Sequence, residues 1–126
     1  MTTKLAGLTL MIGAVTVESF AQMFLKVGAA GGPRALSSPF RELAARSRAG
    51  SSPATWVGLG VLFYGLEILA YTLALSCLDV SVAFPLGSLC FVGVAILSKF
   101  FLGEAVGTIR WLGVGCIVAG AVFVTL

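Results

Sequence analysis

The stretch LAGLTLMIGAVTVESFAQMFLKV, Leu5–Val27, is almost entirely apolar but carries one acid, Glu18. A helix of this length, at about 1.5 Å per residue, crosses the roughly 30 Å hydrocarbon core of a bilayer. An acid at the centre of such a helix costs about 2.5–3.5 kcal/mol on insertion scales. We therefore expect Glu18 to line a partner helix or a wet cavity and to serve function. The alternative is a neutral, hydrogen-bonded packing residue.

Two further polar residues share the helix face of Glu18. Gln22 and Lys26 follow it at i+4 and i+8, which places all three side chains on one side of a helix. This face is a candidate substrate- or proton-binding surface.

The composition, 59% hydrophobic and 10% charged over 126 residues, indicates a membrane protein. We expect an all-α membrane protein with a single four-helix transmembrane domain, residues 1–126, packing as a dimer. The expected spans are residues 5–27, 56–77, 80–102 and 109–126. The cytoplasmic loop 28–55 is expected to contain an interfacial helix at 39–49, with Ser38 as its N-cap.

The sequence gives no sign of a metal site, a cofactor site or an enzyme. It has no histidine, no phosphate-binding glycine loop and three cysteines without metal spacing, Cys77, Cys90 and Cys116. We expect these cysteines to be small apolar packing residues. No nucleic-acid partner is expected, because the net charge of +3 concerns topology and lipid headgroups.

Basic residues lie mainly in the first and third loops and at their edges. Seven lie there and only Lys4 lies on the opposite side; the seven are Lys26, Arg34, Arg41, Arg46, Arg48, Lys99 and Arg110. Because cytoplasmic loops are rich in Lys and Arg, both termini are expected to face outward from a bacterial inner membrane. Four of the seven, Arg34, Arg41, Arg46 and Arg48, are expected to contact lipid headgroups. The alternative is a flexible loop with scattered arginines.

The second span contains another buried acid, Glu67, between Tyr64 and Tyr71 on one helix face. Counted from the cytoplasmic ends of their spans, Glu18 and Glu67 lie at about 14 Å and 16 Å, so an antiparallel pair of helices would bring them level. They could then titrate together, exchange protons or hold a cationic group. Otherwise Glu67 is a packing residue, bonded to Tyr64 or a water.

The third and fourth spans carry two other patterns. Pro85 frees a backbone carbonyl and is expected to kink the third span, beside Phe84, Gly87 and Ser88. Helix breaks of this kind usually line a cavity, although an irregular start of the helix would also explain the position of Pro85. The fourth span aligns small residues that favour a dimer interface: Gly113, Cys116 and Gly120.

These residues resemble the small four-helix branch of the drug/metabolite transporter superfamily. The small multidrug resistance family has a first-span acid with a lysine eight residues later, a second-span tyrosine, and a fourth-span glycine pair used in dimerisation. The matching residues are Glu18 and Lys26, Tyr64, and Gly113 with Gly120. Where that family has a tryptophan and a tyrosine in the third span, this chain has Gly87 and Phe84.

A second resemblance is to the aminoarabinose–phosphoundecaprenol flippase subunits. It rests on AFPLGSLCFV in the third span, Gly103–Glu104 after it, AQMFLK at Ala21–Lys26, and the extended first loop. That resemblance implies movement of a lipid-linked sugar from the cytoplasmic to the periplasmic leaflet. Because four helices make a thin wall around a substrate path, we expect a homodimer or a heterodimer with a similar four-span chain.

Three functions remain open. The leading one is a flippase-like transporter of a lipid-linked or amphiphilic, sugar-bearing substrate, in which Lys26 and the loop arginines meet a phosphate. The second is a proton-coupled exporter of small organic cations, in which Glu18 binds proton and substrate in turn. The third is a non-transporting accessory subunit whose buried acids specify a partner helix.

The charge bias predicts one orientation for nearly all copies. In a background without native cysteines, a cysteine at Thr2 should react with an impermeant thiol reagent from outside only, and one at Ser51 from inside only. Labelling of each position from both sides in comparable amounts would instead establish dual topology.

Overall fold

The computed structural model describes residues 2–46 and 52–125, and within them every regular element is helical. This confirms the all-α class predicted from the sequence. The elements are α1 (Thr2–Ala29), the short 3₁₀ helix η1 (Pro33–Ala35), α2 (Ser38–Arg46), α3 (Pro53–Leu75), α4 (Val80–Gly87), α5 (Cys90–Phe101) and α6 (Thr108–Thr125).

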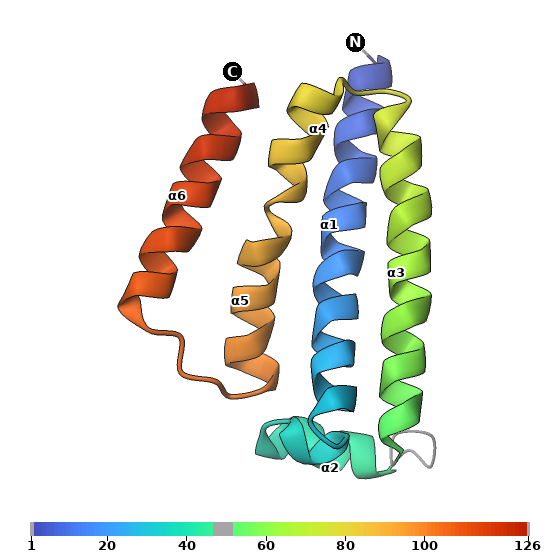
Figure 1. The fold of residues 1–126 in the computed structure, drawn as a ribbon, viewed down its shortest axis with the longest axis vertical. Helices are drawn as coiled ribbons and strands as arrows, with labels where there is room; N and C mark the ends of the chain where they lie inside the picture. Colours follow the sequence, from blue (N-terminus) through green and yellow to red (C-terminus); the bar gives the residue numbers. More distant parts are fainter. Residues whose placement is uncertain (1, 47–51, 126) are drawn as a thin grey trace.

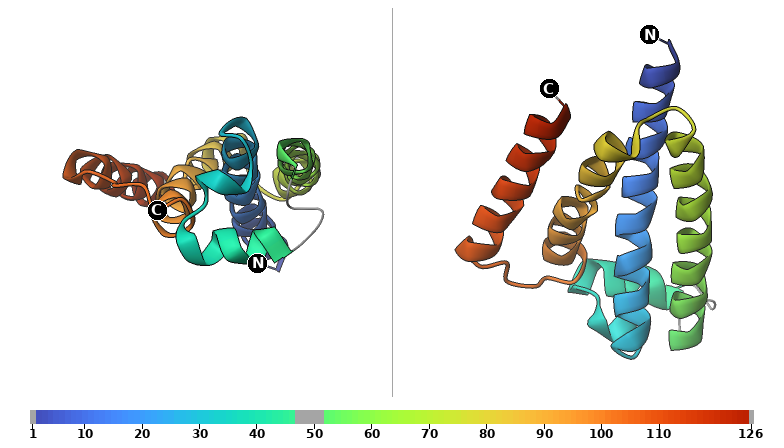
Figure 2. Two further views of the ribbon diagram at one scale, coloured as in Figure 1. Left: turned by 90° about the horizontal axis from the view of Figure 1, so that it is seen from below. Right: turned by 45° about the horizontal axis from the view of Figure 1, so that its top comes forward.

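Four segments among the described residues are long and apolar enough to cross a membrane: α1, α3, α4 with α5, and α6. They stand side by side in the order α3, α1, α4/α5, α6 (Figure 1). Seen along the bundle, they form roughly a single layer, and α2 crosses its lower end (Figure 2). The chain ends at Thr2 and Thr125 lie at the opposite end from α2. One face of each spanning helix therefore has no partner helix among the described residues.

The tightest packing joins α1 to α3, and glycines make it possible. A Cβ added at Gly60 would lie 2.7 Å from the Leu25 side chain and 3.1 Å from its backbone nitrogen. Phe24 then fills the space beside this contact, with its ring 5.7 Å from Trp56 and 5.1 Å from Phe63. Small residues that let helix backbones approach closely are typical of membrane packing, where van der Waals contact is the main attraction.

The third span is interrupted three residues after Pro85. Ser88 and Leu89 form a turn between α4 and α5, in which the Ser88 N–H donates to the carbonyls of Phe84 (3.3 Å) and Pro85 (3.2 Å). The Ser88 hydroxyl also donates to the Pro85 carbonyl, at 2.5 Å. These bonds satisfy backbone groups that the broken helix would otherwise leave unpaired inside the hydrocarbon layer. The break thus lies one turn beyond the proline at which the sequence predicts a kink.

The loop after α1 is docked onto the far end of α5. The Ser37 N–H donates to the Phe101 carbonyl at 2.8 Å, and the Phe40 and Phe101 rings stack with centroids 4.3 Å apart. The carbonyl of Ser37, rather than that of Ser38, accepts the first helical bonds of α2, so the N-cap prediction was wrong by one residue. Within the expected helix 39–49, residues 47–49, with Arg48, lie outside the described residues, as does Ser51.

The close approach of α1 and α3 predicts that Gly60→Ala destabilises the fold by about 1–3 kcal/mol, because overpacking forces the helices apart. Gly58→Ala, in the same helix, is the matched control, since a Cβ there would meet nothing described within 4 Å. The measurement is unfolding of the purified protein in detergent. Equal stability of the two variants would contradict the packing described here.

Candidate functional site

Glu18 and Glu67 line a single cavity of about 430 Å³ at the break in the third span. Glu18 reaches it from α1 and Glu67 from α3, in an antiparallel pair of helices. The remaining lining residues are Ile68, Tyr71, Thr72, Phe84, Gly87, Ser88, Cys90 and Phe91. We call this space the acidic cavity. Of the ten binding residues predicted from the sequence, it brings six together.

The two carboxyl groups are close enough to influence each other. Glu18 interacts electrostatically with Glu67, with the Tyr64 hydroxyl group and with the Cys90 thiol. Both acids are half-buried. Because both carboxyl groups line the same cavity, the pair offers acceptor oxygens to a cationic or hydroxyl-bearing group.

Gly87 gives the acidic cavity its room. A Cβ at this position would lie 3.3 Å from Cε of Met11 and 3.6 Å from Cε2 of Tyr71. A large aromatic side chain would therefore fill the space between α4 and the α1–α3 pair. Ser19 lies at the inner side of the break, where its hydroxyl hydrogen is shared between the carbonyls of Val15, at 2.8 Å, and Cys90, at 3.3 Å.

Four predicted residues lie outside the lining of the acidic cavity. Gln22 donates a hydrogen bond from Nε2 to the Tyr64 hydroxyl group, one turn along α1 from Glu18. This bond ties α1 to α3 and orients Tyr64 near the acids. Pro85 acts through the backbone, since its carbonyl accepts the bonds from Ser88. Lys26 lies elsewhere, in a second cavity.

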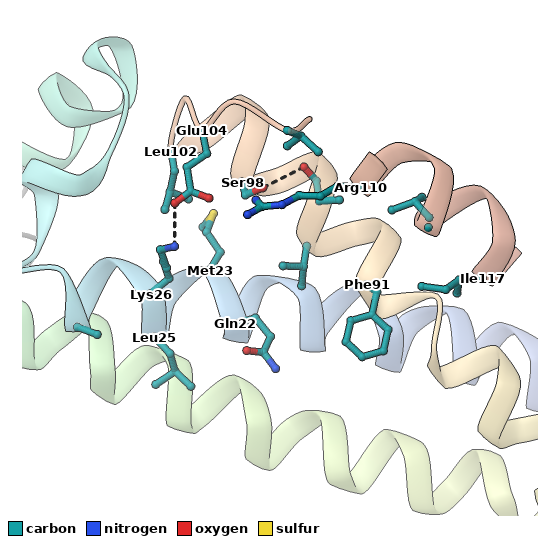
Figure 3. Close-up of a pocket in the computed structure, with 16 residues that line it drawn as sticks. Gln22, Met23, Leu25, Lys26, Phe91, Ser98, Leu102, Glu104, Arg110 and Ile117 are labelled. Atoms are coloured by element: carbon teal, nitrogen blue, oxygen red, sulfur yellow. Dashed lines mark hydrogen bonds and ion pairs between the residues drawn. The ribbon is translucent and has the colours of Figure 1, made fainter. Parts of the chain in front are cut away.

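The second cavity, of about 670 Å³, lies between α1, α5 and α6 toward the end of the bundle that carries α2 (Figure 3). Here Nζ of Lys26 pairs with Oε1 of Glu104 at 2.8 Å. The Arg110 side chain, from α6, points toward Ser98 and this ion pair. We call this space the basic cavity, because Lys26 and Arg110 outnumber the single acid among its lining residues. Phe91 lines both cavities, so they are neighbours.

Sequence reasoning missed several of these residues. Three of them have apolar or weakly polar side chains that do not indicate a binding role: Phe91, Ile68 and Cys90. Thr72 could have been found, because it follows Glu67 and Ile68 along one side of α3. The Lys26–Glu104 pair joins residues far apart in the sequence, and only the docking of α1 beside α5 reveals it. The sequence feature that comes nearest to predicting this ion pair is the position of Glu104, an acid directly after the third apolar span.

The other predicted contacts lie at the surface. Arg34, Arg41 and Arg46 are exposed at the end of the bundle that carries α2, and Arg48 lies outside the described residues. In α6, Gly113 lines the basic cavity, whereas Cys116 and Gly120 are exposed outside it. Within residues 2–46 and 52–125, no group of three His, Cys, Asp or Glu side chains could hold a metal ion.

Comparison with known proteins finds relatives over about half of the chain. An uncharacterized protein, y4nH, of Sinorhizobium fredii is 40% identical over 65 residues, which are 51% of this chain and 56% of that protein. A probable 4-amino-4-deoxy-L-arabinose-phosphoundecaprenol flippase subunit, ArnE, of Escherichia fergusonii is 36% identical over 55% of this chain and 62% of its own length. The corresponding protein of Klebsiella pneumoniae is 39% identical, over 53% and 60%. The chain thus spans somewhat over half the length of these relatives.

No solved structure matches the chain. The profile of the EamA-like transporter family, in contrast, matches residues 5–126, which cover nearly all of the first membrane-spanning segment and the whole of the other three. The chain therefore belongs to the EamA-like transporter family.

Proposed function

We propose that this protein is a flippase-like transporter that moves a lipid-linked or amphiphilic, sugar-bearing substrate across the bacterial inner membrane. The observation that carries the proposal is the acidic cavity, in which Glu18 and Glu67 meet at the broken third span. Each acid lies within about 5 Å of the midpoint of its helix, measured along the helix axis, so the polar group of a substrate would be held near the bilayer centre.

The lining of the acidic cavity suits a polar headgroup. The carboxyl groups would bind an amine or hydroxyl groups of the sugar, and the hydroxyl groups of Tyr71 and Ser88 would add hydrogen bonds. Phe84 is 73% exposed although it lines the cavity, which supports an opening toward the surroundings of the helices. A lipid tail could therefore stay in the hydrocarbon layer while the headgroup enters.

The relatives support the same substrate class. The proteins named as flippase subunits carry the name of an amino sugar joined through a phosphate to a polyprenol. An amino sugar has a cationic group that pairs with a carboxylate, and this chain presents two carboxyl groups at one cavity. We propose a related lipid-linked sugar for this chain.

A second candidate function is proton-coupled export of small organic cations. It is favoured by the rings of Tyr71, Phe84 and Phe91, which line the same cavity as the acids and could hold a cation by cation–π attraction. In this mechanism Glu18 would release a proton when the cation binds. An accessory subunit without transport activity is the third candidate, and it predicts that the wild-type protein is inactive in both transport assays described below.

We further propose that a second four-span chain, identical or similar, completes the transporter. The helices of this chain form roughly one layer, so the acidic cavity has walls from one side only. The face of α6 with Cys116 and Gly120 is exposed, beside large apolar side chains such as Phe123, which is 79% exposed. Small and apolar residues on one helix face favour contact with another helix.

The proposed orientation places both termini outside and α2 in the cytoplasm. The structure supports it because α2 and the link between α5 and α6 lie at the same end of the bundle. The basic residues of α2 lie there, whereas Lys4 belongs to the first turn of α1, at the other end of the bundle.

If Glu18 serves transport, Glu18→Gln should reduce it by roughly tenfold or more, since glutamine keeps the packing hydrogen bonds but cannot hold a cation or release a proton. Glu42→Gln, an exposed acid of α2 outside both cavities, is the matched control. The readouts are accessibility of a lipid-linked sugar on the outer leaflet and efflux of a quaternary ammonium compound.

Loss of the first activity alone selects the flippase, and loss of the second alone selects the exporter. Membrane insertion and assembly of the variant should match the wild type, as measured by size-exclusion chromatography. Full activity of Glu18→Gln in both assays would show that the acid only packs.

The dimer proposal predicts that Gly120→Leu disperses the oligomer in mild detergent, because the larger side chain blocks close approach of another helix. Gly113 is left unchanged because it lines the basic cavity. Gly115→Leu, on the opposite side of α6, is the control, since a Cβ there also has open space. An unchanged mass of the Gly120 variant by light scattering would place the interface elsewhere.

A further inference from the structure

The basic cavity contains charged residues that do not line the acidic cavity. Its charged lining residues are Lys26, Arg110 and Glu104. Lys26 is paired with Glu104, whereas Arg110 makes no ion pair with any described residue although it points toward the pair. Two cations facing one acid leave a net positive charge, which favours an anionic ligand.

The depth of this cavity matches the phosphate layer of a membrane. Lys26 lies about 16 Å from the midpoint of α1 along the helix axis, close to the roughly 15 Å half-thickness of the hydrocarbon core. At the same end, Nζ of Lys99 lies 5.6 Å from the ring centroid of Trp111. Tryptophan and lysine are typical of the interface between hydrocarbon and headgroups.

The remaining walls are mostly apolar and come from three helices. Met23 belongs to α1, Phe91 and Val94 to α5, and Val114 and Ile117 to α6. A volume of about 670 Å³ is within the range of small-molecule sites. The cavity can therefore hold an anionic group at its polar end and part of a hydrocarbon chain along its walls.

We propose that the basic cavity binds the phosphate group of a phosphorylated amphiphile, with Lys26 and Arg110 as its ligands. The guanidinium group of Arg110 offers paired N–H donors that match phosphate oxygens, and Lys26 adds a point charge. Glu104 acts as an internal competitor that occupies Lys26 until a phosphate replaces its carboxylate. Replacement is feasible because the Lys26–Glu104 pair is exposed, with 55% and 36% of the two side chains accessible.

This inference deepens the proposed function and relies on it only for the identity of the transported molecule. Lys26 lies eight residues from Glu18 on the same face of α1, which is about 12 Å along the axis. Because Phe91 borders both cavities, one lipid-linked sugar could place its phosphate at Lys26 and Arg110 and its sugar toward Glu18.

The experiment measures binding of radiolabelled geranyl phosphate to the full chain in dodecyl maltoside micelles, which contain no phosphate. Lys26→Gln and Arg110→Gln should each weaken binding roughly tenfold, the expected effect of removing a charged donor. Glu104→Gln should strengthen binding, because it removes the competing carboxylate. A gain of affinity cannot arise from misfolding, and Arg110 is exposed and unpaired with any described acid, so its loss does not threaten the fold.

Two controls make the result specific. Lys99→Gln removes an equal charge at the same end of the bundle but outside the cavity lining, and it should leave binding unchanged. Geraniol, which lacks the phosphate, should compete weakly or not at all. Equal competition by geraniol, unchanged binding in the Lys26 and Arg110 variants, or weaker binding in the Glu104 variant would each overturn the proposal.

Further competitors identify the source of the phosphate. Competition by phosphatidylglycerol would assign the site to bilayer lipids, whereas resistance to it would assign the site to polyprenyl phosphates; both results retain the phosphate site. Inorganic phosphate, tested alone, should compete only weakly because it lacks the chain. Glu18→Gln should bind geranyl phosphate normally. A wild-type protein that binds it through Lys26 and Arg110 but moves no lipid-linked sugar would defeat the proposed function and leave this site intact.

Discussion

The cost of a carboxyl group in hydrocarbon is the constraint on which this structure depends. A bilayer core offers no water to solvate Glu18 or Glu67, so both acids must face protein or a polar cavity. In a chain whose helices form roughly one layer, the faces that α1, α3 and α4 turn toward one another meet this need. The close α1–α3 contact, made possible by Gly60, holds the two acid-bearing helices together, and the break at Ser88 contributes Ser88 to the cavity that both acids line.

Much of this arrangement could be predicted from the sequence, because hydropathy and helical periodicity are local properties. The four spans follow from apolar length, and the meeting of Glu18 with Glu67 follows from their depths in antiparallel helices. The position of the helix break could not be predicted as well, since it depends on which carbonyls Ser88 reaches after Pro85. Nor could the pairing of Lys26 with Glu104, because it requires the link after α5 to fold back toward α1.

The same one-layer arrangement accounts for the uneven packing of the chain. Met11, Ala74 and Ala83 form a small buried core where α1, α3 and α4 meet, whereas α6 has one buried residue, Ala121. A helix held this loosely can separate from α5 at low cost, since the attraction between membrane helices comes mainly from close contact. The basic cavity lies between α1, α5 and this loosely packed α6.

The order of charges along α1 bears on which substrate the chain can accept. A small cation that approached from the end carrying α2 would meet Lys26 and Arg110 before it reached Glu18 and Glu67, and like charges would repel it. A lipid-linked sugar would be attracted rather than repelled. Its phosphate, near the lipid tail, would face the cations, and an amine or hydroxyl groups on its sugar would face the acids. A free cation would have to enter by another route, through lipid or from the outer side. This arrangement of the two cavities is the reason for proposing a phosphate-bearing, lipid-linked substrate rather than a simple organic cation.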